Sequence, residues 1–510
     1  MIGVTSAGVM RARGAKRSER ETDDQMQGDD HTRQVDDTPA RPVDPDAGTA
    51  DLLRRTAELA IEHRAGLPNR PVAPRVPAAA IRDALGGPMP DHGEPANAII
   101  EALARDVSPG LMAMPGPRFF GFVIGGSLPA ALAADWLTSA WDQNAPSAVS
   151  SPSAAAVETI AAHWLVELLG LPGGTSVGFT TGATMANFTG LAAARDAVLR
   201  RVGWDVEADG LHGGPRVSVV IGEDAHVTVF LGLRMLGFGE KAPLRVAADQ
   251  EGRMRLDALR TILGRSSGPT IVCLQAGNVN SGSFDPLAAA IAVVRELRPD
   301  AWIHIDGAFG LWAAAVPSLR HRIAGYEGAD SWTTDAHKWL NVPYDCGLVF
   351  VRDPEAHRAA MGMSASYLPF NTGDERDPGD FVPELSRRAR GFPVYAALRS
   401  LGRSGVVELV ERCCELARRF ADGLAGDPVT EVLNEVVLNQ VLVRFDDSDD
   451  RTRDVVARLQ ADGTAWFGGG AWHGRAVMRI SVSNWWTRAD DVDRSLDAIR
   501  RCLAESRRAT

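Results

Sequence analysis

Short apolar runs alternate with segments of helical spacing through the middle of the chain. Five runs have the length and composition of buried strands: 176–180, 217–221, 270–275, 301–305 and 346–351. Three segments carry apolar residues at the spacing of one helix face: 185–201, 228–236 and 287–297. Apolar strands that alternate with helices are typical of a mostly parallel sheet covered on both faces. The pattern predicts an α/β fold in which ligands bind at the carboxyl ends of the strands.

The two ends of the chain differ from this middle region. Residues 1–50 are rich in Asp, Arg, Gln, Thr and Pro and poor in large apolar side chains, which predicts a disordered tail. Residues 51–130 show helical spacing interrupted by prolines. We assign residues 131–400 to a large domain. Residues 401–510 combine a long helical stretch with strand-like segments at 436–445 and 476–482 and a last helix from Ala489, which predicts a small α+β domain.

Composition narrows the classes of protein. The net charge is -11 and no basic stripe is interleaved with aromatic residues, which argues against a nucleic-acid partner. The five cysteines are scattered, in neither a disulfide framework nor a metal-ligand spacing. No apolar run approaches the roughly 18 residues of a membrane span. The charge order of the N-terminus is the reverse of a signal peptide's. We expect a soluble, cytoplasmic protein without a metal or membrane partner.

The scarcity of lysine points to one position. Only three of the 54 basic residues are lysines, namely Lys16, Lys241 and Lys338. Arginine cannot lose its proton, whereas lysine can form a Schiff base with a carbonyl. Lys16 lies in the polar tail and Lys241 in a turn, so both have the setting of solvated charges. Lys338 lies between Trp332 and Trp339 in a stretch of low charge. A lone surface lysine is the alternative, but composition and context favour Schiff-base chemistry at Lys338.

Three other segments at strand ends fit the same chemistry. Gly182 and Ala183 follow a strand and open a helix whose free N–H groups can bind phosphate, although such turns are often structural. Asp306 ends an apolar strand, where a carboxylate is costly unless it is paired. It is either a cap or the partner of a protonated pyridine nitrogen. His226 also follows a strand; alone it has the setting of an ordinary histidine, but in this set it can stack on a heterocycle.

From about Asp51 onward the chain resembles the group II pyridoxal-phosphate-dependent decarboxylases, of the aromatic-amino-acid and glutamate decarboxylase type. The segments that carry the resemblance are Pro-Arg-Phe-Phe-Gly at 117–121, Thr-Gly-Ala-Thr at 181–184, His226, residues 277–286, His-Ile-Asp-Gly-Ala at 304–308 and Asp-Ala-His-Lys-Trp-Leu at 335–340. The resemblance implies the fold type I of pyridoxal-phosphate-dependent transferases and an L-amino-acid substrate. It also implies a homodimer with the site at the subunit interface and residues 51–130 packed on the partner.

The resemblance also implies roles for single residues. Lys338 is the residue that forms the internal aldimine with pyridoxal 5'-phosphate, Asp306 pairs with the ring nitrogen and His226 stacks on the ring. The other expected cofactor contacts are the phosphate-binding residues Gly182, Ala183, Thr184 and His337, together with Ala308 under the ring, Asn278 near its polar edge, and Asp335, where the family has Asn or Asp. The expected reaction is decarboxylation to an amine and CO2.

Two departures from the family keep the product and the substrate open. The family's catalytic-loop tyrosine protonates the reacting carbon, yet the matching neighbourhood 377–385 has Phe381 and no tyrosine. Tyr367 is the tyrosine that lies in the expected loop, and we assign it the catalytic proton transfer. The segment after Phe120 lacks the aromatic-rich substrate wall of the aromatic decarboxylases. The alternatives are an aldehyde synthase, an aminotransferase or a pyridoxal-phosphate-binding protein without turnover.

Overall fold

The computed structural model describes residues 46, 48–363 and 375–509, and the chain divides into two units, residues 1–54 and 55–510. Almost all of the predicted tail therefore lies outside the described residues. Helix α1 (Thr49–Gly66) begins in the first unit, where Arg54 pairs with Asp51, and no residue of this helix is buried. The description that follows concerns the second unit.

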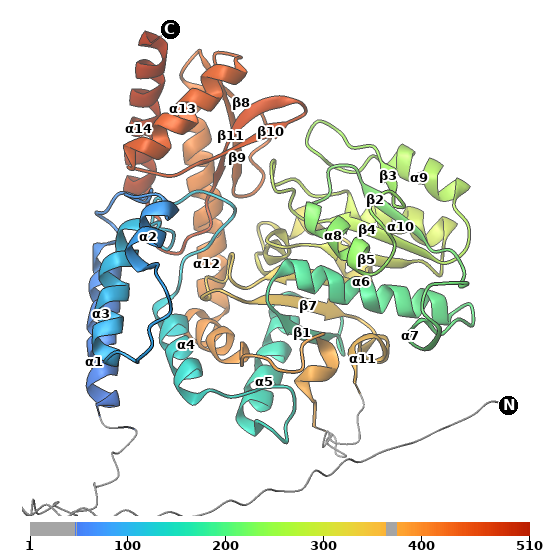
Figure 1. Ribbon diagram of the computed structural model, residues 1–510. Coiled ribbons are helices and arrows are strands. Elements are labelled where there is room, and N and C mark those ends of the chain that lie inside the picture. The colour runs from blue at the N-terminus through green and yellow to red at the C-terminus, as the bar shows by residue number, and fades with distance from the viewer. Residues whose placement is uncertain (1–45, 47, 364–374, 510) are drawn as a thin grey trace, which may run out of the picture. The chain divides into compact units, whose positions relative to one another are not determined.

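A seven-stranded sheet forms the centre of the second unit (Figure 1). Its strands are β1 (Ser176–Thr180), β2 (Ser218–Gly222), β3 (Leu244–Val246), β4 (Thr270–Gln275), β5 (Trp302–Asp306), β6 (Ser331–Asp335) and β7 (Gly347–Val351). The order across the sheet is β1-β7-β6-β5-β4-β2-β3, and only β7 runs antiparallel to its neighbours. The predicted α/β fold with a mostly parallel sheet is confirmed.

Helices cover this sheet. Those of the large sheet region are α4 (Pro129–Trp141), α5 (Pro152–Leu168), α6 (Ala183–Arg200), α7 (Val206–Asp209), α8 (Val227–Met235), α9 (Leu256–Arg265), α10 (Leu287–Leu297) and α11 (Pro354–Met361). The three helices predicted in the middle region agree with α6, α8 and α10 within two residues. The pattern missed α4 and α5, which both begin with a proline in the first turn, where its missing N–H costs nothing.

Strand β6 was also missed as a strand, and its sequence explains why. It reads Ser-Trp-Thr-Thr-Asp, yet all five residues are buried. Its polar side chains find partners inside the protein: the Ser331 hydroxyl lies 2.8 Å from His304 Nδ1, and the Thr333 hydroxyl donates to Asn187 Oδ1 at 2.8 Å. A hydrophobic pattern cannot detect a strand whose buried residues are polar and mutually satisfied.

A second sheet of four antiparallel strands lies near the C-terminus, in the order β10-β11-β9-β8. Its elements are β8 (Thr430–Val432), β9 (Gln440–Phe445), α13 (Asp449–Asp462), β10 (Gly468–Trp472), β11 (Arg475–Ser481) and α14 (Ala489–Arg508). The long helix α12 (Gly391–Ala425) packs on α4 and α5 and also on β8, β9 and α14, so it joins the two sheet regions. It is interrupted at Gly402, whose φ of 59° is left-handed.

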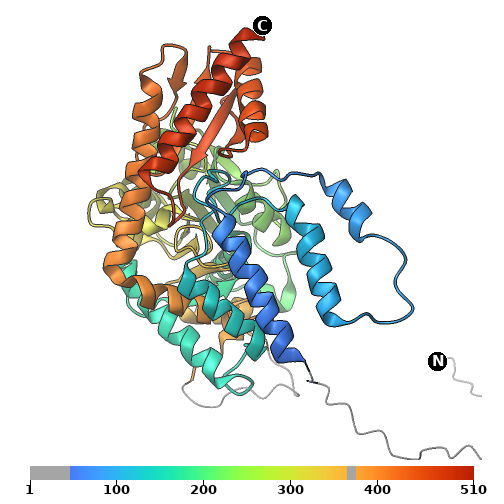
Figure 2. The ribbon, with the colours of Figure 1, turned by 90° about the vertical axis from the view of Figure 1, so that its left-hand side faces the viewer.

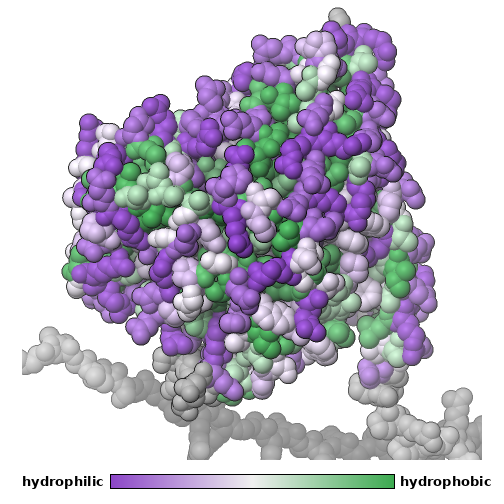
Figure 3. All heavy atoms as spheres, turned by 180° about the vertical axis from the view of Figure 1, so that it is seen from behind, coloured by the Kyte–Doolittle hydropathy of each residue, from purple (hydrophilic) through white to green (hydrophobic). Residues whose placement is uncertain are grey.

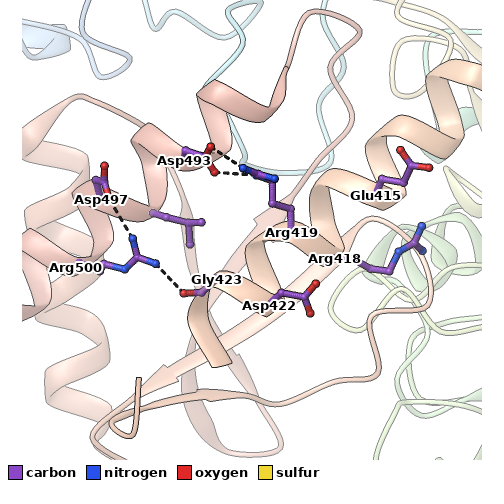
Figure 4. A pocket seen from close by; sticks show the side chains of 9 residues that line it. Glu415, Arg418, Arg419, Asp422, Gly423, Asp493, Asp497 and Arg500 are labelled. Atoms are coloured by element: carbon purple, nitrogen blue, oxygen red, sulfur yellow. Dashed lines mark hydrogen bonds and ion pairs between the residues drawn. The ribbon is translucent and has the colours of Figure 1, made fainter. Parts of the chain in front are cut away.

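Helices α12 and α14 approach closely at Gly423, where a Cβ atom would lie 2.5 Å from Leu496 Cδ1. Charged side chains border the crossing (Figure 4): Arg419 pairs with Asp493, and Arg500 donates to the Gly423 carbonyl oxygen. These pairs are about half exposed, so they fix the crossing with only a small gain in stability.

Short helices near the N-terminal end of this unit are α2 (Ala78–Leu85) and α3 (Ala96–Val107), and neither has a buried residue. Figure 2 shows both standing clear of the sheets. The remaining short elements are 3-10 turns at Ser108–Gly110, Gly310–Ala315, Arg320–Ile323, Tyr326–Gly328 and Pro378–Phe381. No helix of the described residues is long and apolar enough to cross a membrane.

Candidate active site

A cavity of about 380 Å³ opens at the carboxyl ends of the central strands. Three strands of the sheet end at it, β4 with Gln275, β5 with Asp306 and β6 with Asp335. The turn between β1 and α6 forms one wall. The lining residues are Thr181, Gly182, Ala183, Thr184, His226, Thr228, Gln275, Gly277, Val279, Asp306, Ala308, Phe309, Asp335, His337, Lys338 and Tyr344. The position agrees with the expectation that ligands bind at strand ends.

Lys338 is held inside this cavity by an ion pair. Its Nζ lies 2.9 Å from Asp335 Oδ2, and its side chain is 18% exposed. The other carboxylate oxygen of Asp335 accepts a hydrogen bond from the Ala183 backbone N–H at 2.6 Å. Asp335 therefore ties the lysine to the start of α6, and the amine stays within reach of the solvent in the cavity.

Two glycines allow the backbone to pack this closely around the lysine. A Cβ on Gly125 would lie 1.9 Å from the Lys338 carbonyl oxygen, and a Cβ on Gly347 would lie 2.4 Å from the Gly182 carbonyl carbon. Both distances are shorter than any van der Waals contact, so the segment near Phe120 and strand β7 can support the site only with glycine at these positions.

The N-terminus of α6 offers backbone donors to an anion. Gly182 precedes the helix without a side-chain cap, so the first-turn N–H groups other than that of Ala183 are available. Beside them, His337 Nδ1 accepts the Cys346 backbone N–H at 3.2 Å, which places the proton of the neutral ring on Nε2. Burial lowers the pKa of His337, so the ring is a neutral donor at pH 7.

Asp306 is buried at the end of β5, with 5% of its surface exposed. Its Oδ1 accepts a hydrogen bond from the Ala308 N–H at 3.1 Å. No described cation forms an ion pair with it, so a buried carboxylate faces the cavity with hydrogen-bonding capacity left. A protonated ring nitrogen would supply the missing partner.

His226 caps the N-terminus of α8 and lines the cavity. Its Nδ1 lies 2.7 Å from the Thr228 hydroxyl oxygen and also accepts the Thr228 backbone N–H at 3.4 Å. Burial lowers the pKa of His226, and the charges of Lys338 and Arg479 lower it further against the opposing effect of Asp306. The ring is therefore neutral at pH 7, with its proton on Nε2.

The donor set fits pyridoxal phosphate. It combines an amine, a helix N-terminus for a phosphate, an unpaired buried carboxylate for a ring nitrogen and a flat neutral imidazole, all on one cavity. The predicted residues that the structure brings together are Gly182, Ala183, Thr184, His226, Asp306, Ala308, Asp335, His337 and Lys338. Their individual roles toward the cofactor remain predictions.

Three other residues were named from the sequence. Asn278 does not line the cavity: its Oδ1 accepts the Asn280 and Ser281 N–H groups, and its Nδ2 donates to the Asp224 carbonyl oxygen, so its role at the ring edge stays a prediction. Tyr367 lies outside the described residues. Phe381 is buried beneath β1, with its ring 5.2 Å from that of His357.

The structure adds one polar lining residue that the sequence did not single out, and one cation outside the lining whose charge acts on His226. Gln275 lines the cavity, although as the last residue of a predicted strand it had no motif to mark it. Arg479 lies on β11; its Nη1 donates to Asn280 Oδ1 at 3.4 Å, its Nε has no partner, and no described carboxylate pairs with it. The usable sequence signal was a single basic residue inside the apolar run 476–482.

Comparison with known proteins identifies similar molecules. A family described as "Pyridoxal-dependent decarboxylase conserved domain" matches residues 80–446. The chain is 28% identical to tryptophan decarboxylase 1 of Oryza sativa subsp. japonica, over 89% of this chain and 93% of that protein. It is also 28% identical to 4-hydroxyphenylacetaldehyde synthase of Rhodiola rosea, over 79% and 84%. A crystal structure of Oryza sativa TDC with PLP and tryptamine superposes with a TM-score of 0.84 at 25% identity, covering 91% of this chain and 99% of that one.

Proposed function

We propose, since the chain belongs to the pyridoxal-dependent decarboxylase family, that it removes the α-carboxylate of an L-amino acid as CO2 and releases the corresponding amine. Family membership makes the chain a pyridoxal-phosphate-dependent carboxy-lyase with the fold type I. The observation that carries the specific proposal is the arrangement of Lys338, Asp306 and the α6 N-terminus around one cavity.

When bound, pyridoxal phosphate supplies an aldehyde that condenses with amines and a protonated ring that accepts the electron pair of a broken bond. Lys338 is the amine of this chain that would hold the aldehyde carbon. The N–H groups of the α6 N-terminus, with Thr184 and His337, would bind the phosphate. Asp306 would keep the proton on the ring nitrogen, because a buried carboxylate without a counter-ion is stabilised by that charge.

Two groups suit the substrate carboxylate. Neutral His226 can donate from Nε2, and Arg479 supplies a positive charge near His226 without a carboxylate partner of its own. A cation in partly buried surroundings attracts an anion more strongly than it would in water. We infer that these two groups orient the carboxylate that leaves.

We favour the amine as the product, with Tyr367 as the proton donor. The aldehyde alternative requires that the reacting carbon lacks its usual acid, as it would if Phe381 occupied the protonating position. Phe381 is 4% exposed and packed between His357 and the guanidinium of Arg376, whose carbon lies 4.5 Å from the ring centroid. Phe381 does not line the cavity, which removes this residue as an argument for the aldehyde.

The decisive experiment is a panel of L-amino acids incubated with the holoenzyme, with CO2, amine, aldehyde and peroxide measured together. We expect CO2 and amine in equal amounts for at least one amino acid. If aldehyde and peroxide were the main products, the proposed amine formation would be wrong, and the activity named for the Rhodiola rosea relative would be favoured instead. Release of no CO2 from any amino acid would contradict decarboxylation altogether.

We also propose that the protein works as a homodimer in the cytoplasm, with residues 51–130 packed on the partner. Large apolar side chains are exposed on four helices: Ile61 on α1, Ile99 and Leu103 on α3, Trp136, Leu137 and Trp141 on α4, and Ile160 on α5. Figure 3 shows one face on which apolar side chains are exposed among polar ones. Exposed apolar groups at this density are typical of a subunit interface.

The oligomeric state can be tested by light scattering after size exclusion. Trp136→Glu, which places a charge on the exposed face of α4, should convert a dimer to a monomer. The matched control is Val202→Glu, since Val202 is 52% exposed in the turn after α6 and away from these helices. A wild-type monomer, or a Trp136→Glu protein that stays dimeric, would contradict the proposed interface.

A further inference from the structure

A series of buried hydrogen bonds joins the seven-stranded sheet to helix α6. The Trp302 indole Nε1 donates to the Ser331 hydroxyl oxygen at 2.8 Å, and the same oxygen lies 2.8 Å from His304 Nδ1. His304 Nε2 lies 2.9 Å from Asn187 Oδ1, which also accepts the Thr333 hydroxyl at 2.8 Å. All five residues are at most 1% exposed. The series therefore connects β5 and β6 to α6 without access to solvent.

The direction of each bond follows from the donors that are present. Burial lowers the pKa of His304 to about 3, so the ring is neutral at pH 7 and has a single N–H. Ser331 accepts the indole N–H, and among the described residues His304 Nδ1 is the acceptor for the hydroxyl proton of Ser331. The ring proton is therefore on Nε2 and is donated to Asn187. His304 thus accepts from β6 and donates to α6.

The side-chain oxygen of Asn187 explains why an asparagine occupies this position. Its Nδ2 is buried and has no hydrogen-bond partner among the described residues, which costs free energy, so packing alone does not account for the amide. More than half of the buried residues of α6 are Ala or Gly, whose non-directional contacts do not fix how far the helix slides along the sheet. Hydrogen bonds require both a distance and an angle. The two bonds to Asn187 Oδ1 therefore specify the position of α6.

The faces that carry this series lead to the cavity. Side chains two residues apart on a strand share a face, so His304 and Asp306 lie on one face of β5. Residues four apart share a face of a helix, so Asn187 lies one turn beyond Ala183, whose N–H binds the carboxylate at the end of β6. Helix α6 is therefore held at two points one turn apart, and its N-terminus has a fixed place relative to Asp306.

We propose that Asn187 and His304 are positioning residues that set the distance between the N-terminus of α6 and Asp306, and with it the affinity for pyridoxal phosphate. Neither residue lines the cavity. The phosphate and the ring nitrogen belong to one small molecule, so a helix that shifts along the sheet weakens one contact when the other is made. The inference rests on the proposed function through the cofactor contacts assigned to α6 and Asp306.

The first test compares two substitutions of His304. The amide nitrogen of a glutamine reaches the position of the imidazole Nε2, so His304→Gln keeps the donor to Asn187. The amide of an asparagine reaches the position of Nδ1, so His304→Asn keeps an acceptor for Ser331 and loses the bond to α6. Equilibrium dialysis of the holoenzyme against pyridoxal phosphate gives the Kd. We expect a Kd about tenfold higher in His304→Asn and within about threefold of the wild type in His304→Gln.

The visible circular dichroism of the bound cofactor is the second measurement, because it depends on the orientation of the ring. We expect a weaker band in His304→Asn and a band of wild-type intensity in His304→Gln. A purely structural role would lower the thermal midpoint of both variants and leave the Kd and the dichroism unchanged. A His304→Asn protein with the wild-type Kd, or a His304→Gln protein that binds as weakly as His304→Asn, would overturn the proposal.

Thr333→Val tests the same link if the His304 variants do not fold, because it keeps the size of the side chain and removes the hydroxyl that donates to Asn187. We expect a Kd about threefold higher than that of the wild type, and Thr333→Ser should restore the wild-type value. An unchanged Kd in Thr333→Val would contradict the positioning role.

Thr452→Val is the matched control. Thr452 is 1% exposed on α13, and its hydroxyl donates to the Ser448 carbonyl oxygen at 2.8 Å, outside the lining of the cavity. This substitution should lower the thermal midpoint and leave the Kd for pyridoxal phosphate unchanged. CO2 release from the amino-acid panel is measured separately from the Kd. A failure of the proposed reaction is therefore distinguishable from a failure of this inference.

Discussion

Two clusters of buried charged side chains in this protein differ in whether their carboxylates are fully paired within the protein. The cavity cluster consists of Asp306, Asp335 and Lys338, and the Glu158 cluster consists of Glu158, Arg376 and Arg387. In the Glu158 cluster, Arg387 Nη1 lies 2.9 Å and Arg376 Nη1 3.2 Å from the carboxylate of Glu158, which is 1% exposed. The two arginines also donate to the carbonyl oxygens of β1 residues, Arg387 to Phe179 at 2.9 Å and Arg376 to Val177.

The Glu158 cluster supplies hydrogen-bond donors to backbone carbonyl groups at one edge of the seven-stranded sheet. Strand β1 is the last strand on its side, and arginine donors satisfy carbonyl groups that no neighbouring strand can reach. In the cavity cluster, Lys338 and Asp335 satisfy each other, but Asp306 keeps capacity toward the cavity. Burial and charge are common to both clusters, so they do not distinguish a site. A ligand site is distinguished by hydrogen-bonding capacity that is unused and faces a cavity.

The largest effect should come from Lys338→Ala. Without the amine the cofactor loses its covalent attachment, so we expect CO2 release to fall about a thousandfold or more, equivalent to about 4 kcal/mol. The visible band that borohydride removes from the wild type should be absent. Lys241→Ala is the control and should keep both properties. Full activity in Lys338→Ala would show that the cavity cluster takes no part in the reaction.

Asp306→Asn should act next most strongly, because it removes the charge that holds the ring proton while keeping the size of the side chain. We expect CO2 release to fall on the order of a hundredfold to a thousandfold, together with weaker binding of pyridoxal phosphate. Fluorescence titration of the apoprotein measures that binding. A variant with most of the wild-type activity and affinity would mean that another acid protonates the ring.

Glu158→Gln tests the other cluster, where we expect a loss of stability rather than chemistry. Two buried guanidinium groups would lose their counter-ion, which costs about 3–5 kcal/mol of unfolding free energy. Glu167→Gln on the same helix is the control: Glu167 pairs with Arg403 at 2.9 Å but is 63% exposed, so its loss should cost about 0.5 kcal/mol or less. Equal thermal midpoints for the two variants would show that the Glu158 cluster contributes little.

A smaller effect is expected from acid, and it involves one histidine near each cluster. Burial lowers the pKa of His304 and of His357 to about 3. Below about pH 6.5 the unfolded chain binds protons that these folded rings do not, so stability falls with the pH, by about 3 kcal/mol per ring at pH 4. His357→Gln should make the midpoint of unfolding less dependent on pH. An unchanged slope between pH 7 and pH 4 would contradict this account.

The sequence by itself determined the α/β fold and much of the site. Continuous apolar runs are long enough to specify buried strands, and the rarity of lysine singles out Lys338. The sequence also placed Gly182, His226 and Asp306 at strand ends, and parallel strands bring such ends to one edge of the sheet. These features are local, so a linear pattern can carry them.

Only the tertiary structure decided the pairings that cross the fold. It showed that Asp335 joins Lys338 to Ala183, that the Asn278 side chain is used within its own loop, and that Phe381 is enclosed under β1. It also brought Gln275, which no sequence motif marked, to the lining of the cavity. A hydrogen-bonding group has the same sequence signature whether its partner is present or missing, because that partner comes from a distant part of the chain. Spare capacity is therefore visible only after folding has brought the partners together.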